Sequence, residues 1–300
     1  MFSTGEFEML EEGALVVVGG ATGYCGGHVA RALHEAGFRV RALARDGSKL
    51  KALGECCDEV FEARATEAET LRGLCDGASA LFSSIGVRSF GRKPTIWDVD
   101  RDANLNLLRE AERAGVDRVV FVSVLRGDEL RRELAVAEAR EQVADAIEAS
   151  DVVGTILRPT GFFNDMEEFL RMAHKGRCWL IGDGEKRINP IHGADIGAAA
   201  VEALKSADAP RSVDLGGPDT FSFREIGELA FRVLGTPPRL GRVPTWVLRS
   251  AASVTRPFNI NAATFIKMFA CAGSSDAVAP EGGTHHLEHH FRTVAQTLTA

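Results

Sequence analysis

The sequence predicts an α/β protein with a doubly wound parallel sheet and a smaller, mostly helical C-terminal substrate lobe. Six short apolar runs, at 14–18, 38–44, 58–63, 80–84, 118–123 and 152–157, alternate with segments of helical periodicity near 24–36, 48–54, 67–75, 98–114 and 133–149. Helical crossovers between these runs would place the strands in parallel and cover both faces of the sheet. After Arg158-Pro159 the alternation stops. One helix at 193–205 and one strand at 212–215 return to the sheet, and the pattern from residue 221 onward is mainly helical.

We expect the 300 residues to form a single domain. Its core sheet is expected in about 13–158 plus 193–216, and its substrate lobe in about 159–192 and 219–300. Ligands of open parallel sheets bind beyond the carboxyl ends of the strands. The lobe is therefore expected to close over a substrate cleft at that edge.

A glycine-rich turn follows the first apolar run. The run Leu15–Val18 leads into a turn with glycines at every third position, and Val29, Leu33 and Ala36 then share one face of a helix. Glycines allow a sharp turn, and a helix N-terminus offers unpaired N–H groups and a positive dipole end to a diphosphate. This order of strand, turn and helix predicts a Rossmann-type dinucleotide site, although a tight turn in an unrelated α/β protein is the alternative. The expected cofactor-binding residues here are Gly20, Ala21, Thr22, Gly23, Tyr24, Cys25 and Gly26.

Bulk composition excludes several classes of function. The net charge of −7 argues against nucleic acid as the main partner, because phosphate backbones are bound by basic surfaces. No apolar run approaches the ~18 residues that a membrane span needs. Residues 1–13 are too acidic for a targeting peptide, and the six scattered cysteines suit a reducing compartment. We therefore expect a cytoplasmic protein that acts on a small-molecule substrate.

The end of the second predicted strand indicates which coenzyme binds. NAD-specific sites place an acidic residue there to hold the ribose hydroxyls, whereas this strand ends in Arg45, with Lys49 and Lys51 close by. A guanidinium can hold a 2′-phosphate with paired hydrogen bonds. NADP(H) is therefore expected, and NAD(H) is less favoured. The alternative is that Arg45 is a solvated charge and that Asp46 contacts the ribose.

Short motifs are spread in order along nearly the whole chain. They are the 20–26 turn, Ser83-Ser84-Ile85-Gly86, Asn104-Leu-Asn106-Leu-Leu108, Val122-Ser123, Arg158-Pro-Thr-Gly-Phe-Phe163, Gly182-Asp-Gly184, Asn189-Pro-Ile-His192 with Asp195, and Gly216-Gly-Pro218. Each is modest alone, but together their order and spacing resemble the NmrA-like group of atypical short-chain dehydrogenases/reductases. Several of them, with Phe231-Arg-Val-Leu-Gly235 and Val243-Pro244, are also similar to the divinyl chlorophyllide 8-vinyl reductases.

The resemblance implies roles at matching positions. Ser84, Ile85 and Gly86 would line the path from the adenosine to the nicotinamide, and Ser123 would flank the nicotinamide with the 158–162 segment. Their places at strand ends independently suggest the same crevice. The cofactor-binding residues expected from these segments and from the following helix are Val122, Ser123, Arg140, Pro159, Thr160 and Phe162.

One departure from the wider superfamily affects the chemistry. Most members use Tyr-x-x-x-Lys on the helix after the fifth strand, where the phenol passes a proton and the lysine lowers its pKa. The helix expected at 133–150 has neither residue, and Tyr24 is the only tyrosine in the chain. Arg140 could hold a ribose hydroxyl but is too basic to transfer protons near neutral pH. Any reaction must use another proton donor, or none.

Three residues are candidates for a catalytic role, namely Ser123, His192 and Asn164. His192 could protonate a substrate near neutral pH, or it could fix its loop through a backbone hydrogen bond while Asp195 caps or holds the next helix. Asn164 and Asp165 could face the substrate or begin a helix as a cap. Of Phe162 and Phe163, one could stack on nicotinamide or substrate, and the other is expected in the core.

Four histidines gather near the C-terminus, at 285, 286, 289 and 290. On a helix the i, i+4 pairs could share a metal ion, but the order does not match His-Glu-x-x-His and no cysteine is near. We therefore predict an exposed terminal helix and no metal site.

Three functions compete. The first is an NADP(H)-dependent reductase of a small or medium hydrophobic molecule, which the lobe and the phenylalanines favour. The second is an NADP(H)-binding sensor or assembly protein without turnover, which the missing Tyr-x-x-x-Lys pair favours. The third is an isomerase or epimerase, against which the lack of a tyrosine base argues.

Overall fold

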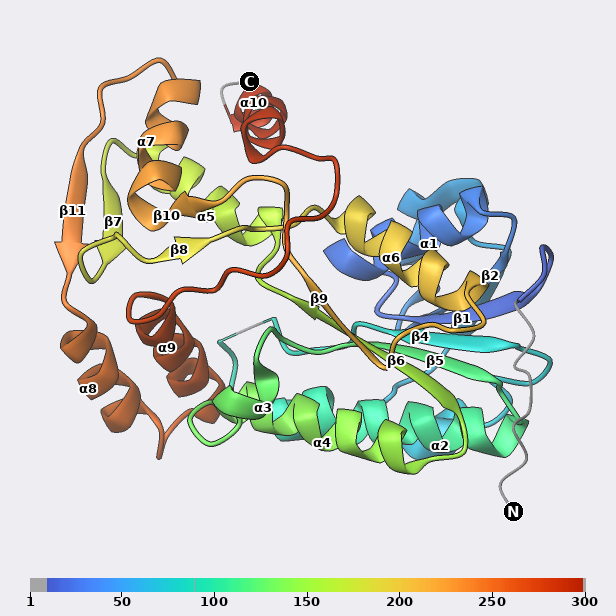
Figure 1. Cartoon of the computed structure of the whole chain (residues 1–300). Helices are drawn as coiled ribbons and strands as arrows, with labels where there is room; N and C mark the ends of the chain where they lie inside the picture. The colour runs from blue at the N-terminus through green and yellow to red at the C-terminus, as the bar shows by residue number, and fades with distance from the viewer. Residues whose placement is uncertain (1–9, 89, 299–300) are drawn as a thin grey trace.

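The computed structural model describes residues 10–88 and 90–298 (Figure 1). Residues 1–9, most of the acidic N-terminal segment considered above, lie outside the described residues. Within them the main sheet has seven parallel strands in the order β3-β2-β1-β4-β5-β6-β9. The strands are β1 (Leu15–Gly19), β2 (Arg39–Ala44), β3 (Glu59–Glu62), β4 (Ala80–Ser83), β5 (Arg118–Val122), β6 (Val153–Pro159) and β9 (Ser212–Leu215). The order reverses between β1 and β4, which is the switch point where ligands of such sheets bind.

Helices cover both faces of this sheet (Figure 1). Helices α1 (Tyr24–Glu35) and α6 (Gly193–Lys205) lie on one face, and α2 (Asn104–Ala114) and α4 (Ala135–Ala149) lie on the other. Alternation along β1 explains this arrangement, because Val16 and Val18 belong to the core cluster under α1 and α6, whereas Leu15 and Val17 belong to the cluster under α2 and α4. The doubly wound parallel sheet predicted from the sequence is confirmed.

The connections differ from the expected helices in three places. The segment 47–56 is a 3₁₀ helix (Gly47–Cys56) interrupted where Gly54 adopts φ of +55°. The helix expected at 67–75 is a single 3₁₀ turn (Ala68–Leu71), since Gly73 and Gly77 have positive φ, so the β3–β4 crossover is mostly irregular. The helix expected at 98–114 begins with a π-helical segment (Trp97–Ala103), and a four-residue helix α3 (Gly127–Leu130) precedes α4.

The C-terminal region has its own core beside the sheet. Its members include Phe163, Leu180, Ile226, Phe231 and Phe291, all fully or nearly fully buried. Its elements are α5 (Phe163–His174), β7 (Cys178–Ile181), β8 (Arg187–Ile188), β10 (Phe221–Ser222), α7 (Phe223–Val233), β11 (Leu240–Val243), α8 (Thr245–Thr255), α9 (Ile260–Ala272) and α10 (Leu287–Leu298). The strand pairs β7–β11 and β8–β10 were not expected from the sequence. No helix in the described ranges is both long and apolar enough to cross a bilayer.

The segment between α9 and α10 runs back to the sheet. Asn189, which is fully buried, donates to the carbonyl oxygens of Gly217 and Ala279 and accepts from the amide of Ala279. Further along, the amide of Thr284 donates to Asp195 in the first turn of α6 (3.1 Å). These bonds bring residues 279–284 beside the N-terminus of α6, next to the glycine-rich turn.

Candidate dinucleotide-binding site

The glycine-rich turn is packed too closely for side chains at two positions. Gly20 has φ of +87°, and its carbonyl oxygen accepts from the amide of Gly23 (2.8 Å). A Cβ on Gly26 would overlap the carbonyl oxygen of Gly20 and lie 2.5 Å from its carbonyl carbon. The turn and α1 therefore pack backbone to backbone, which requires glycine at both places.

The N-terminus of α1 is open to an anion. Gly23 caps the helix without a side-chain hydrogen bond, and the first turn contains no acidic residue. A cavity of about 190 Å³ adjoins the turn. Its lining residues include Thr22, Gly23, Arg31 and Lys49. Unpaired first-turn amides, a positive helix end and two nearby cations fit the diphosphate of a dinucleotide.

Tyr24, which also lines this cavity, and Cys25 are the two larger side chains of the turn, and each is engaged in contacts of its own. The Tyr24 hydroxyl accepts from the amide of Gly193 (3.1 Å), and burial raises its pKa far above the ordinary value, so it stays protonated. The Cys25 thiol is buried against Ser84, and burial raises its pKa to about 12. Tyr24 therefore links the turn to α6, and Cys25 fills space beneath it.

The residues at the end of β2 bear on whether Arg45 binds a 2′-phosphate or Asp46 contacts the ribose. Asp46 caps the following 3₁₀ helix, accepting from the Ser48 amide (3.0 Å) and hydroxyl (2.6 Å), and these bonds lower the pKa of its carboxyl group. Arg45 is exposed, and no ion pair is recorded for it in the described part of the chain. One oxygen of the Asp46 carboxylate is therefore bonded within its own loop, and the Arg45 guanidinium is exposed beside it.

A buried polar network lies at the carboxyl ends of β4 and β5. Arg140 donates to the carbonyl oxygens of Val122 (2.5 Å) and Ile85 (3.4 Å) and pairs with Asp100 (2.8 Å). A Cβ on Gly86 would overlap this guanidinium. Arg140, Ile85, Gly86 and Val122 are therefore in contact at the carboxyl ends of β4 and β5. Burial, partly offset by Arg140, raises the pKa of Asp100.

Asn104 joins the end of β4 to the π-helical segment through four hydrogen bonds. Its amide nitrogen donates to the carbonyl oxygens of Ile85, Val99 and Asp100, and its oxygen accepts from the Ser83 hydroxyl (2.6 Å). The side chain thus contacts the π-helical segment from which Asp100 projects, and such segments are frequent at functional sites.

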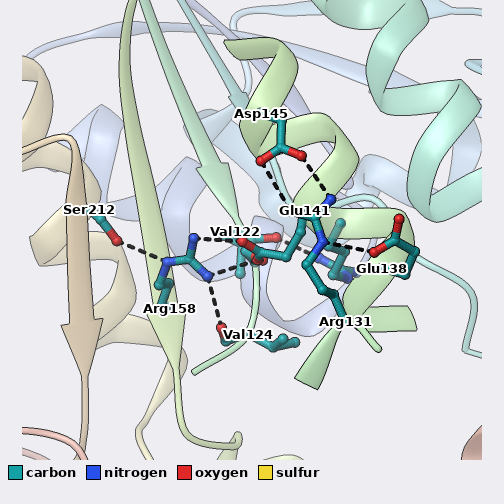
Figure 2. A network of polar contacts seen from close by, with 10 residues as sticks. Val122, Val124, Arg131, Glu138, Glu141, Asp145, Arg158 and Ser212 are labelled. Carbon is teal, nitrogen blue, oxygen red and sulfur yellow. Dashed lines mark hydrogen bonds and ion pairs between the residues drawn. The ribbon is translucent and has the colours of Figure 1, made fainter. Parts of the chain in front are cut away.

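Ser123 belongs to a second network. Its hydroxyl donates to Glu141 Oε1 (2.6 Å). Both carboxylate oxygens of Glu141 accept from Arg158 (2.7 and 2.8 Å), as Figure 2 shows. Arg158 also donates to Ser212 on β9 (2.9 Å). The Ser123 proton is therefore engaged by a buried carboxylate, and the Ser123 side chain is itself buried. Sequence reasoning missed Glu141, although it is a charge on the buried face of α4, which is a usable signal.

Pro159 and Thr160 lie beside this network at the end of β6. Pro159 is buried, and the Thr160 hydroxyl donates to the carbonyl oxygen of Asn189 (2.7 Å). The Thr160 side chain thus links β6 to the loop before α6. Both residues lie at the carboxyl edge of the sheet, where the sequence analysis places them.

His192 has a structural contact. Its Nδ1 accepts from the amide of Ala194, which is the backbone hydrogen bond that the second interpretation expects. The cap of α6 is His192 itself, however, and Asp195 accepts from the amide of Thr284 instead of capping the helix. Its ring stacks on His285 (4.4 Å between centroids) and lies edge-on to His28 (4.7 Å). Burial, with the neighbouring histidines, lowers the pKa of His192 to about 4, so the ring is neutral near pH 7 and a poor proton donor.

The residues after β6 form the other wall of the crevice. Phe163 is buried in the C-terminal core, whereas half-buried Phe162 faces Tyr24 (6.1 Å between centroids), so one of the two is core as expected. Neither Asn164 nor Asp165 caps α5, because the N-cap is Phe162 and no side-chain cap bond is present. Asn164 Oδ1 is buried and has no recorded hydrogen-bond partner among the described residues. Asp165 faces Arg88 (3.6 Å), and loss of hydration raises the pKa of Asp165 although half of the side chain is exposed.

The expectation for the C-terminal histidines is wrong in part. His285 and His286 precede α10 instead of lying on it, since the helix begins at Leu287. His285 pairs with Asp195 (2.8 Å) and His290 with Glu167 (3.1 Å), and α10 buries Leu287, Phe291 and Ala295. The described residues contain no cluster of His, Cys, Asp and Glu that could hold a metal ion.

A family profile described as NAD(P)H-binding matches residues 20–207. The chain belongs to the NAD(P)H-binding, NmrA-like atypical short-chain dehydrogenases/reductases. It is 27% identical to the chloroplastic divinyl chlorophyllide a 8-vinyl-reductase of Cucumis sativus, over 80% of this chain and 61% of that protein. It is 26% identical to the photosystem II assembly factor Ycf39 of a Synechocystis strain, over 81% and 74%. In fold it is similar to the NADPH-dependent quinone oxidoreductase QOR2 from Escherichia coli in complex with NADPH, with a TM-score of 0.73, 18% identity, and 95% and 100% of the two chains covered.

Proposed function

We propose that this NAD(P)H-binding protein is an NADP(H)-dependent reductase of a small or medium hydrophobic molecule. The observation that carries the coenzyme choice is the end of β2, where Arg45 is exposed and Asp46 is already bonded to Ser48. A 2′-phosphate there would meet the Arg45 guanidinium, while one oxygen of the Asp46 carboxylate is bonded to Ser48. The NADPH complex of a protein with a similar fold supports the same coenzyme choice, and the relatives named as reductases support the class of reaction.

The crevice residues would position the coenzyme and the substrate. The bound coenzyme would supply a hydride from its nicotinamide ring. Arg140 has charge and donors for ribose hydroxyls, with Asp100 fixing the guanidinium (2.8 Å). Ser123 lies at the same edge, with its proton bonded to Glu141. Half-buried Phe162 provides an apolar wall beside Tyr24.

Asp165 is the proposed source of the proton. Its raised pKa keeps a larger protonated fraction near neutral pH than an ordinary aspartate has, and part of its side chain is reachable by a substrate. The neighbouring Asn164 Oδ1, which lacks a recorded partner, would orient the substrate or the nicotinamide amide. Reduction of an activated double bond suits this arrangement better than reduction of a plain ketone, because no phenol is available to protonate an alkoxide.

The coenzyme proposal is tested by fluorescence titration of Arg45→Ala with NADPH and NADH. Loss of charge-assisted hydrogen bonds worth ~1.5–3 kcal/mol should weaken NADPH binding by about 10- to 150-fold and leave NADH binding nearly unchanged. Arg64→Ala is the control, because Arg64 is an exposed cation in a weak surface pair on another loop. Equal losses for both coenzymes would refute the NADP(H) preference.

Turnover is tested by following NADPH absorbance against enones, quinones and vinyl compounds. With any accepted substrate, Asp165→Asn should lower kcat by about 10²-fold or more, and it should abolish the decline in kcat with rising pH that loss of the Asp165 proton would cause. An unchanged pH profile in this variant would exclude Asp165 as the proton donor.

A second function is a coenzyme-binding assembly or sensor protein without turnover. The absence of the Tyr-x-x-x-Lys pair and the similarity to an assembly factor favour it. Tight NADPH binding without oxidation across the panel, together with coenzyme-dependent affinity for a protein partner, would support this function over the reductase.

A further inference from the structure

One surface of the C-terminal region is both apolar and basic. Helices α8 and α9 form a hairpin whose exposed side chains include Trp246 (67% exposed), Val254 (70%) and Phe258 (69%). Trp246, Val247 and Val254 lie on one side of α8, opposite Ala252, its buried residue. Five of the nine exposed large apolar side chains in the described residues belong to this hairpin, so they form a group and are not scattered. We call Trp246, Val247, Val254, Phe258 and Phe269, with Arg242, Arg249 and Arg256, the hairpin surface.

The charges on this surface have one sign. Residues 229–275 include six arginines or lysines and no aspartate or glutamate, in a chain whose net charge is −7. Arg242, Arg249 and Arg256 are exposed, and no ion pair is recorded for any of them among the described residues. Arg242 does lie near the Asp183 carboxylate, whose pKa it helps to lower, so Arg249 and Arg256 are the stronger candidates for binding an anion. Figure 1 shows α8 at the outer edge of the lobe, away from the sheet. The surface therefore presents aromatic and aliphatic groups together with exposed arginines.

We propose that the hairpin surface binds the face of a membrane that contains anionic lipids. Exposed Trp and Phe insert at the level of lipid headgroups, and adjacent arginines attract the lipid phosphates. A two-fold contact with a second copy is disfavoured, because it would bring the same arginines of both copies together. The helices of the hairpin have 11 and 13 residues, so they would lie in the interface and not cross the bilayer.

The hairpin is also joined to the mouth of the crevice. Asn261 donates to the carbonyl oxygens of Gly91 and Pro94, and Phe90 packs on Phe265 (5.2 Å between centroids). The same loop carries Arg88, the partner of Asp165. Membrane binding would thus hold the crevice close to lipid-dissolved molecules. This last step depends on the proposed function, whereas lipid binding itself does not.

The test is flotation of the purified full-length chain with vesicles of phosphatidylcholine alone or with about 30% phosphatidylglycerol, without coenzyme or substrate. We expect binding to the anionic vesicles that weakens with salt. Arg249→Gln with Arg256→Gln should weaken it by about 10- to 30-fold. Trp246→Ser with Phe258→Ser should weaken it by at least about 10-fold.

Matched controls lie elsewhere on the surface. Val60→Ser removes an exposed apolar residue on β3, and Arg64→Gln with Arg109→Gln removes two exposed cations, so neither should alter flotation. Thermal unfolding of each variant serves as the check that it is folded. No binding to anionic vesicles, equal binding to neutral vesicles, or full binding by either hairpin variant would overturn the proposal. A dimer seen by light scattering and lost in Trp246→Ser with Phe258→Ser would overturn it in favour of a second copy.

Discussion

Replacement of Gly26 by alanine tests whether the glycine-rich turn binds the diphosphate through its backbone. The new Cβ would lie 2.5 Å from the carbonyl carbon of Gly20 and 2.9 Å from the amide nitrogen of Ala21. Ordinary contacts begin near 3.4 Å, so the turn and α1 must separate by about 1 Å. Such overpacking lowers the free energy of unfolding by ~1–3 kcal/mol, and the better helix propensity of alanine offsets up to ~1 kcal/mol of this loss. A separation of this size would also stretch amide–phosphate hydrogen bonds beyond their useful range.

Gly27→Ala is the matched control, because it makes the same change one residue later on α1. There the Cβ would lie 3.3 Å from the carbonyl oxygen of Ala21 and touch no other atom closer than 3.7 Å. We expect Gly26→Ala to weaken NADPH binding by 10²-fold or more, on the loss of two charge-assisted hydrogen bonds of ~1.5 kcal/mol each, and Gly27→Ala to remain near wild type. Fluorescence titration and urea unfolding measure both effects. Wild-type affinity in Gly26→Ala would refute the placement of the diphosphate at this turn.

Two further predictions concern stability. His192 has a folded-state pKa of about 4 against 6.5 when unfolded, so the unfolded chain binds more protons and the free energy of unfolding should fall as pH drops from 6.5 to 4. His192→Asn keeps a side chain that can cap α6 and should remove ~1–2 kcal/mol of that fall, a value already reduced because the ring is partly exposed. Urea unfolding at several pH values measures this effect. An unchanged dependence of the free energy of unfolding on pH would contradict the lowered pKa of His192. Glu141→Gln and Asp145→Asn each neutralise a carboxylate that pairs with an arginine, at positions one turn apart on α4 (Figure 2). The Glu141–Arg158 pair is buried, whereas the Asp145–Arg131 pair is partly exposed. The first should cost ~2–4 kcal/mol and the second ~0–1 kcal/mol in thermal unfolding, and equal costs would show that burial does not decide their contributions.

The sequence predicted those parts of the fold that depend on local pattern. Strands β1 to β6, β9 and helix α6 lie where apolar runs and helical periodicity place them, because a two-faced parallel sheet demands both signals. The short strands β7, β8, β10 and β11 pair across the C-terminal region over two to four residues, and such pairing leaves no local periodicity. The helix expected at 67–75 failed because glycines with positive φ follow its first turn.

For the candidate site, too, the order of elements could be predicted from the sequence, whereas the contacts between side chains could not. The turn at 20–26 and the strand ends near Gly86 and Ser123 followed from chain order, since parallel strands bring their carboxyl ends together. The side-chain pairings did not. Nothing in the local sequence indicates that Asp46 bonds to Ser48, that Glu141 engages Ser123, or that His285 stacks on His192, because the last two depend on segments 18 and 93 residues apart meeting in three dimensions.

The return of residues 279–290 to the N-terminus of α6 has a consequence for biosynthesis. His285 stacks on the histidine that caps α6 and pairs with Asp195 one turn into that helix, beside the turn that follows the first strand. A nascent chain therefore cannot complete these surroundings of the β1–α1 unit until residues 279–290 have also left the ribosome. Until then, the glycine-rich turn and α6 await packing partners from a segment that is synthesised long after them.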